Sequence, residues 1–536
     1  MDEQTAKLLI QSLLERAESS SEKVFLSTVE AAAIRILFGK DDYRPVQTPG
    51  PTGANQETIS DTISFEITSD KIEKNYMMCL DFGTSFSKAF AYNSSSTDGS
   101  MLDLKIGSVM SGASELLLPS ELFIDDGNIY FGVAARTHFD DVEADQDRLI
   151  DSPKQYLTLG SDVAKLSEKD LPQAAKKDSE KRLKQRDALV LFLSHLNLKA
   201  EEALSQSGHP INIIRRYTHP AWADEINENN KIATRRILAE AIAISRSYPQ
   251  FVNSKASLSK LIPILSEARK LDNDELSVPF QLIGDAVREA TAAGSGALLS
   301  TLPGVRNSFV VVDIGAGTTD VAGCYCVRHG VTGDLKTSEE SSAAKAIRQA
   351  GNVLDHGLLK LVLDKIPYDS QSAEYGVTKA QLQKMKRQYK EILFSSGELT
   401  IDLPDDNNIT ISLEEFLSQK TTINFVEKLK SLIVTAGKIV DNGNTVYLVP
   451  TGGGARLPFI KQIVGEIRTE NHSLTMEIRD AMSQELKETN PDLVDPYPQL
   501  AVAVGGSMPD LPEQKTNISG GINDPGRTEM RPSYKT

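Results

Sequence analysis

A glycine-rich turn within residues 308–321 combines side chains suited to phosphate and magnesium chemistry. The apolar, β-branched run before it predicts a buried strand, and its glycines predict a tight hairpin whose backbone can approach a ligand closely. Backbone N–H groups and hydroxyls suit phosphate oxygens, and carboxylates beside them suit the water shell of Mg²⁺. The candidate residues are Asp313, Gly315, Gly317, Thr318, Thr319 and Asp320. For this stretch alone, an ordinary glycine turn in a β-hairpin is the alternative.

The same design occurs earlier in the chain, within residues 77–92. An apolar strand runs into an aspartate, a glycine and a hydroxyl pair, and a second alternating strand follows. The residues of this turn are Asp81, Gly83, Thr84 and Ser85. Two copies of one pattern predict two similar lobes, each presenting a hairpin to the same phosphate chain.

A triple glycine, Gly452, Gly453 and Gly454, follows a third apolar strand. Such a turn lets a flat ligand lie against the backbone, and the guanidinium of Arg456 could stack on a base. Pro458 stands at a favoured first-turn position and predicts a helix there. This loop is a candidate for the nucleoside part of the ligand.

Other phosphate-binding motifs do not fit the sequence. There is no G-x-x-x-x-G-K-[ST] stretch, and Asp320 stands where the third glycine of G-x-G-x-x-G would be. The turn before Asp320 also leads to a predicted strand rather than to a helix. The P-loop and Rossmann interpretations are therefore excluded.

Length and composition limit the remaining classes. A chain of 536 residues with 40% hydrophobic and 25% charged residues predicts a globular protein of two or more packed units. The formal net charge of −16 argues against a general nucleic-acid binder. Because no long apolar run and no basic leader are present, we expect neither a membrane span nor a secretory signal. The three cysteines suit a reducing, cytoplasmic location, and their spacing favours core packing over a metal site.

Four segments are predicted along the chain. Residues 1–74 form a helical extension and linker, which either binds a partner or docks on the main domain. Residues 75–305 form lobe I and residues 306–507 form lobe II, with the last helix returning to lobe I. Residues 508–536 form a disordered tail rich in Pro, Gly and Ser.

Taken in order, the three turns resemble the actin-like ATPase superfamily, and most closely the nucleotide-binding domain of heat-shock protein 70 (DnaK-type) chaperones. Ser152-Pro-Lys154-Gln-Tyr156 resembles the segment with that family's catalytic lysine. Arg288-Glu289-Ala-Thr-Ala-Ala resembles its Glu-Pro-Thr-Ala-Ala segment, and Thr218-His-Pro-Ala-Trp222 resembles its Val-Pro-Ala-Tyr segment. The matching motifs span residues 76–507.

Departures from the family pattern occur at Ala316 and Thr319 in the second turn and at Ala290, which replaces a proline. Residues 245–275 look like an insertion with its own helix. The helix near residues 386–396 resembles the family's base-clamping helix, but its charged residues fall out of the usual register.

The resemblance implies an α/β, actin-like ATPase fold, in which two lobes, each a ribonuclease-H-like mixed sheet with flanking helices, enclose a central nucleotide cleft. It implies ATP or ADP with Mg²⁺ as ligands. Asp81 and Asp313 would hold Mg²⁺ through water, and Lys154 would meet the γ-phosphate or orient the attacking water. Glu289 would support the metal's water shell and couple hydrolysis to lobe movement. The implied phosphate contacts are Gly83, Thr84, Ser85, Gly315, Gly317, Thr318 and Thr319. The implied adenosine contacts are Gly452, Gly453, Gly454 and Arg456.

We therefore expect a slow ATPase that acts as a heat-shock-protein-70-like switch or chaperone-like regulator on protein partners, without nucleic-acid or membrane ligands. Because only about 30 residues follow Gly506, we expect no peptide-binding domain of that family's kind. An actin-like filament or scaffold protein that uses ATP to control assembly is an open alternative. A sugar or metabolite kinase is a third interpretation, but we find no motif in the sequence that matches the sugar site of such kinases. A nucleotide-binding protein without hydrolysis is disfavoured by the four charged residues Asp81, Lys154, Glu289 and Asp313.

Overall fold

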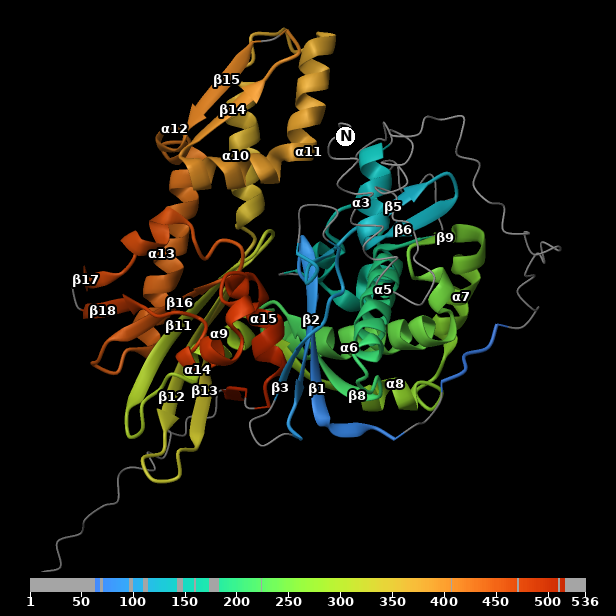
Figure 1. Ribbon diagram of the computed structural model, residues 1–536, viewed down its shortest axis with the longest axis horizontal. Helices are drawn as coiled ribbons and strands as arrows, with labels where there is room; N and C mark the ends of the chain where they lie inside the picture. Colours follow the sequence, from blue (N-terminus) through green and yellow to red (C-terminus); the bar gives the residue numbers. More distant parts are fainter. Residues whose placement is uncertain are drawn as a thin grey trace, which may run out of the picture. The chain divides into compact units, whose positions relative to one another are not determined.

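The computed structural model (Figure 1) describes residues 63–67, 71–95, 100–108, 114–141, 148–158, 161–172, 183–222, 224–405, 407–469, 472–509 and 511–515. Contacts divide the chain into residues 1–62 and residues 63–536, and the described residues all belong to the second part. The predicted N-terminal helices, nearly all of the linker and most of the predicted tail lie outside the described residues.

The first large sheet has the strand order β3-β2-β1-β8-β10, and a short strand, β4, also pairs with β2. Met78 and Leu80 face the leucine-rich helices α5 and α6 on one side of this sheet. Cys79 and its cross-strand partner Phe90 face the other side. The elements are β1 (Glu73–Asp81), β2 (Phe86–Asn93), β3 (Ser100–Asp103), β4 (Leu118–Pro119), α5 (Gln185–Gln206), β8 (Ile213–His219), α6 (Asp224–Ser247) and β10 (Ile283–Arg288).

The second large sheet has the order β17-β18-β16-β11-β12-β13-β19. Its centre is the β11–β12 hairpin, whose apolar run Phe309–Val312 is fully buried, as the sequence predicts. Helix α13 packs on one side of the sheet with the residues of a second core. The elements are β11 (Arg306–Ile314), β12 (Thr319–Arg328), β13 (Leu335–Ile347), α13 (Lys420–Val440), β16 (Val446–Thr451), β17 (Gly465–Thr469), β18 (His472–Ile478) and β19 (Glu513–Lys515).

The two sheets repeat one arrangement of strands. Each has a central hairpin with a third antiparallel strand on one side and two parallel strands on the other: β3-β2-β1-β8-β10 and β13-β12-β11-β16-β18. The turn after Asp81 and the turn after Asp313 therefore occupy equivalent positions in the two sheets.

Helices α9 (Glu289–Leu298) and α15 (Tyr497–Ser507) pack on each other and contact strands of both sheets. Their small residues permit this close approach. A Cβ atom on Gly294 would lie 2.4 Å from a methyl carbon of Val311, and one on Gly505 would lie 1.8 Å from the backbone oxygen of Ala292. Larger side chains at these two positions would separate the helices from their neighbours.

Smaller elements surround the two sheets. Next to the first sheet lie a four-stranded sheet of order β7-β5-β6-β9 and three helices: β5 (Leu122–Asp125), β6 (Asn128–Phe131), α3 (Gly132–Asp141), β7 (Leu149–Ile150), β9 (Lys255–Ser257), α7 (Leu258–Lys270) and α8 (Ser277–Leu282). The chain between β13 and α13 forms α10 (Gly351–Leu363), α11 (Ala373–Ser396), β14 (Glu398–Asp402), β15 (Asn408–Ser412) and α12 (Leu413–Leu417). Helix α14 (Gln484–Thr489) precedes α15.

The predicted α/β class is confirmed, with two differences in detail. The helix expected at Pro458 is only a short 3₁₀ helix, η6 (Pro458–Gln462). Residues 513–515, which belong to the segment predicted as a disordered tail, form β19 and pair in parallel with β13.

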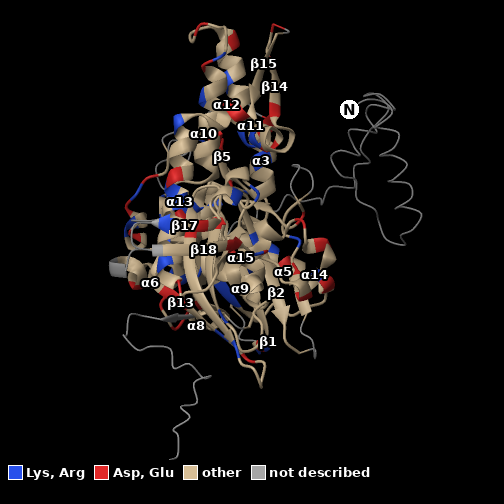
Figure 2. Ribbon diagram, turned by 90° about the vertical axis from the view of Figure 1, so that its left-hand side faces the viewer, with Lys and Arg blue, Asp and Glu red and all other residues tan. Residues whose placement is uncertain are grey.

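Within the part of the chain that the structure describes, no helix is long and apolar enough to cross a membrane. Figure 2 shows acidic and basic residues interspersed along many of the elements.

Candidate functional site

The turns of the two central hairpins meet. A Cβ atom on Gly317 would lie 2.8 Å from Thr84 Cγ2 and 2.9 Å from Thr84 Oγ1, so the two turns are in direct contact. The β11–β12 turn is closed by a hydrogen bond from Gly315 N to the Thr318 carbonyl at 3.0 Å. The first turn is held from outside, because Ser120 Oγ donates to the Gly83 carbonyl at 2.7 Å. The fold thus brings together two glycine turns that are far apart in the sequence.

The triple-glycine loop joins the same place. Gly452 has a φ of 76°, a conformation that glycine adopts without strain. Gly454 N donates to the Ile314 carbonyl at 3.0 Å, and Thr451 Oγ1 donates to Asp313 Oδ1 at 3.1 Å. The loop after β16 is therefore fixed to the end of β11.

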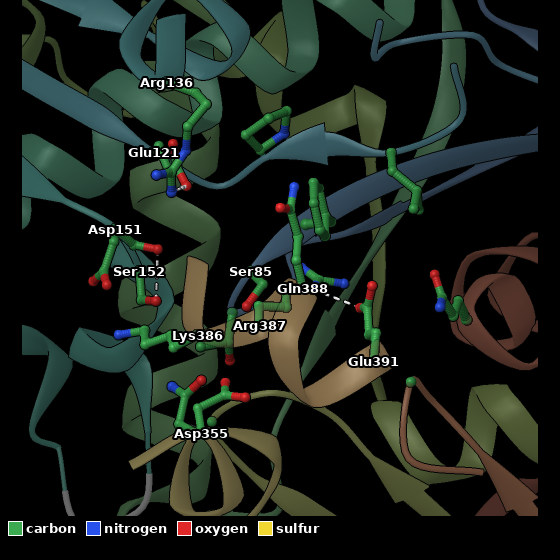
Figure 3. Close-up of a pocket in the computed structure, with 18 of the residues that line it drawn as sticks. Ser85, Glu121, Arg136, Asp151, Ser152, Asp355, Lys386, Arg387, Gln388 and Glu391 are labelled. Carbon is green, nitrogen blue, oxygen red and sulfur yellow. Dashed lines mark hydrogen bonds and ion pairs between the residues drawn. The ribbon is translucent and has the colours of Figure 1, made fainter. Parts of the chain in front are cut away.

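A cavity of about 1400 Å³ opens above these turns. Among the predicted ligand-binding residues, its lining includes Thr84, Ser85, Gly317, Gly452, Gly453 and Arg456. Figure 3 shows its other walls, with Arg136, Glu121 and Asp151 on one side and Arg387 and Glu391 of α11 on another. Gly83, Gly315, Thr318, Thr319 and Gly454 are not among the described lining residues, although they belong to the same turns. Thr319 Oγ1 instead donates to the Gln349 carbonyl at 2.7 Å.

The four charged residues singled out by sequence lie buried near the turns. Lys154 Nζ lies 2.7 Å from Glu289 Oε2, and the two side chains are 5% and 3% exposed. Glu289 Oε1 has no hydrogen-bond partner among the described residues. Asp81 Oδ2 accepts from Lys88 Nζ at 3.0 Å. The sequence interpretation missed Lys88, although the hairpin pairs Asp81 directly with it and strand register could have revealed the contact.

The segment that carries Lys154 is fixed by packing from a distant part of the chain. Lys154 lies in the 3₁₀ helix η3 (Pro153–Leu157), which begins at a proline. Trp222 Nε1 donates to the Leu157 carbonyl at 2.6 Å, at the end of that helix. The backbone N–H of the neighbouring Ala221 donates to Asp320 Oδ1 at 3.2 Å. The predicted Thr218–Trp222 segment thus links the lysine to the β11–β12 hairpin.

Burial and mutual repulsion govern the charges of this cluster. Burial, together with the carboxylates of Asp320 and Asp81, raises the pKa of Asp313 to about 6. The pKa of Glu289 is also raised, mainly by burial, although Lys154 opposes that shift. Burial disfavours the charge on Lys154, but attraction from Glu289 and Asp81 outweighs it and raises the pKa of Lys154. Carboxylates crowded in this way favour a cation beside them.

The buried carboxylates could accept hydrogen bonds from the water shell of a cation. No group of three or more His, Cys, Asp or Glu side chains in the described part of the chain is arranged to hold a metal ion. Asp81 and Asp313 are nevertheless buried acceptors at equivalent turns, and one oxygen of Glu289 has no hydrogen-bond partner among the described residues. Such oxygens suit the water shell that Mg²⁺ retains.

Charged residues of the expected base-clamping helix, and Arg456 of the triple-glycine loop, contact other residues of the protein. The Arg387 guanidinium lies 4.3 Å from the centre of the Phe86 ring, next to Ser85. Lys390 Nζ forms an ion pair with Asp355 Oδ1 at 2.6 Å. Arg456 forms one with Asp495 Oδ1 at 2.6 Å and remains largely exposed. The sequence interpretation missed the Arg387–Phe86 contact, because no local pattern relates α11 to β2.

The sequence matches no known protein-family model and no curated protein.

Proposed function

We propose that this chain binds Mg·ATP in the 1400 Å³ cavity and hydrolyses ATP slowly, as a nucleotide-controlled switch that acts on protein partners. The proposal includes an actin-like ATPase fold with two lobes, built around the two large sheets. The contact between Thr84 and Gly317 carries the proposal, because it joins equivalent turns of two sheets with one strand order at the floor of a cavity.

The chemistry of the turns supports phosphate binding. Thr84, Ser85 and Gly317 line the cavity with hydroxyls and a backbone without a side chain, which suit phosphate oxygens. Gly452, Gly453 and Arg456 line the same cavity and would contact the nucleoside. The cavity exceeds the roughly 300–1,000 Å³ that small-ligand sites usually occupy, so a nucleotide has room.

The buried cluster supports hydrolysis. Mg²⁺, held through water by Asp81 and Asp313, would neutralise charge on the phosphates. Lys154 Nζ would orient a water molecule or meet the terminal phosphate, and the free Oε1 of Glu289 could accept a hydrogen bond from water. Attack of water on the terminal phosphorus breaks its bond to the bridging oxygen and yields ADP and phosphate. Positioning and charge neutralisation are the main demands of this reaction.

The direct test is calorimetric binding of ATP and ADP with Mg²⁺, together with phosphate release by the purified chain. Ser85→Ala removes a cavity-lining hydroxyl and should weaken ATP binding about tenfold, the effect of losing a hydrogen bond to a charged group. Ser259→Ala, on the exposed side of α7, is the matched control. Absence of nucleotide binding by the unsubstituted protein would reject the proposal.

Two further measurements separate the alternatives. An actin-like filament should pellet on centrifugation with ATP, whereas a switch should stay in the supernatant. A metabolite kinase should release ADP faster when its acceptor is present, whereas hydrolysis to water should not respond to small hydroxyl compounds.

A further inference from the structure

Glu339 is a buried carboxylate behind the candidate site, and only 1% of its surface is exposed. It lies on β13, directly opposite Cys324 of β12. Side chains paired across two strands share a face of the sheet, and Cys324 packs in the core that contains the alanines of α9. Glu339 therefore points toward α9. A buried carboxylate is costly unless it is paired and hydrogen-bonded, so its partners define its role.

Both partners of Glu339 come from the start of α9. Arg288 donates from its guanidinium to Glu339 Oε1, and Thr291 Oγ1 donates to Glu339 Oε2 at 2.7 Å. Arg288 immediately precedes the helix, and Thr291 lies in its first turn. The Glu339 carboxylate thus binds a residue before Glu289 in the sequence, Arg288, and a residue after it, Thr291.

The start of α9 has no side-chain cap of its own. Arg288 is the N-cap residue and makes no capping hydrogen bond with its side chain. First-turn N–H groups normally need such a partner, and an uncapped end frays more easily. The hydrogen bonds to Glu339 therefore stabilise the first turn of α9 in place of a cap. They involve the side chains of that turn rather than its backbone N–H groups.

Glu289 is the residue whose position depends on that turn. As the first residue of α9, it extends to Lys154 Nζ at 2.7 Å, and Lys154 belongs to a different segment, η3. The pair forms only if α9 begins at the right place relative to η3. Catalytic groups must be held within about 0.5 Å of the productive geometry by such supporting contacts.

We propose that Glu339, acting through Arg288 and Thr291, is a positioning residue that holds Glu289 against Lys154 for ATP hydrolysis. This inference rests on the proposed ATPase function. It assigns the support of the site to β13 of the second sheet, whereas the supported residue follows β10 of the first sheet. The hydrogen bonds of Glu339 to Arg288 and Thr291 therefore link the second sheet to the segment that follows the first sheet, next to Glu289.

Two substitutions of Thr291 separate positioning from packing. Thr291→Val keeps the size of the side chain and loses the hydroxyl, whereas Thr291→Ser keeps the hydroxyl and loses the methyl group. If the hydrogen bond to Glu339 positions Glu289, Thr291→Val should lower kcat about tenfold, as loss of a supporting contact typically does, and Thr291→Ser should retain the activity. If Thr291 only fills space, Thr291→Ser should be the more damaging change.

Glu339→Gln tests the carboxylate itself, and the chain offers a matched control. Glu201 of α5 is a second buried carboxylate, and its Oε1 lies 2.7 Å from the guanidinium of Arg215 on β8. Glu201 is not among the residues that line the cavity. Glu339→Gln should lower kcat at least tenfold, with a calorimetric Kd for ATP within about twofold of the unsubstituted protein. Glu201→Gln should lower the melting temperature and leave kcat unchanged.

A readout without turnover completes the test. In a crystal structure of the nucleotide-free Thr291→Val protein, the distance from Lys154 Nζ to Glu289 Oε2 should exceed the 2.7 Å seen here, whereas in Thr291→Ser it should not. Thr291→Val with unchanged kcat and an unchanged Lys154–Glu289 distance overturns the inference while leaving the proposed function intact. Absence of ATP hydrolysis by the unsubstituted protein overturns both.

Discussion

Gly317 lies against Thr84, and this contact joins the turns of two hairpins that belong to different sheets. Thr84 is buried and β-branched, so its side chain has little freedom to move aside. The absence of a side chain at residue 317 is therefore a requirement of the contact, as well as a way to expose backbone to a ligand.

Gly317→Ala should push the two turns apart. The added Cβ atom would lie under 3.0 Å from Thr84, and such overpacking costs about 1–3 kcal/mol. We expect ATP binding to weaken about tenfold, because the separated turns would no longer place their ligand-binding groups in the right positions. Calorimetry and urea unfolding measure the two effects. Gly376→Ala, at an exposed position of α11 where a Cβ atom meets nothing within 4 Å, is the control. Normal ATP affinity in Gly317→Ala would contradict this account of the contact.

The Lys154–Glu289 pair predicts an asymmetric effect on stability. Lys154→Met leaves Glu289 buried without its partner, which should cost about 3 kcal/mol of unfolding free energy. Lys154→Met/Glu289→Gln removes both charges and should recover most of that loss, because a neutral pair avoids an unpaired buried charge. Neither variant should hydrolyse ATP at a measurable rate. A double variant as unstable as the single one, or a single variant with full turnover, would be inconsistent with a working buried pair.

The α/β class and the central hairpin of the second sheet could be predicted from the sequence, because local patterns indicate them. The apolar run Phe309–Val312 and the glycines after it predict a buried strand and a tight turn, and both are present. At Pro458 the local signal is weaker: proline favours the start of a helix, but the chain continues for only one short 3₁₀ helix before β17.

The supporting contacts of the site were not predictable in the same way. Trp222 reaches the carbonyl of Leu157, and Glu339 reaches Arg288 51 residues away, across separate elements. Such pairs depend on how sheets and helices pack, and no period or spacing in the sequence encodes them. The motifs thus indicated which residues could do chemistry, whereas the contacts that hold them required the fold.

Asp313 predicts a specific dependence of stability on pH. Its pKa is raised from 3.8 to about 6, so between these values the folded protein binds a proton that the unfolded chain releases. Its contribution therefore stabilises the fold at low pH and is lost as the pH rises from about 4 to 6. Burial is the main cause of this raised pKa; Asp320 and Asp81 raise it further, and Lys88 and Lys154 oppose the shift.

Asp313→Asn should remove that dependence. The unfolding free energy of the nucleotide-free protein, relative to Asp313→Asn, should fall by about 2 kcal/mol between pH 4 and pH 6. Urea unfolding at several pH values measures this difference. Asp274→Asn, at an exposed position after α7, is the control for the substitution itself. A difference that rises with pH would show that Asp313 is ionised more easily in the folded protein, contrary to its burial.

Arg387 predicts how the rim of the cavity affects nucleotide release. Its guanidinium covers the Phe86 ring at 4.3 Å and so connects α11 to β2 across the cavity lining. A cation–π contact at such a site contributes about 0.5–1 kcal/mol, so Arg387→Met should speed release of a fluorescent ADP about two- to fivefold. Arg306→Met is the matched control, because Arg306 covers the Tyr325 ring at 4.4 Å on the second sheet, outside the cavity lining. Stopped-flow release that is equal in the two variants would mean that the Arg387–Phe86 contact does not restrain the nucleotide.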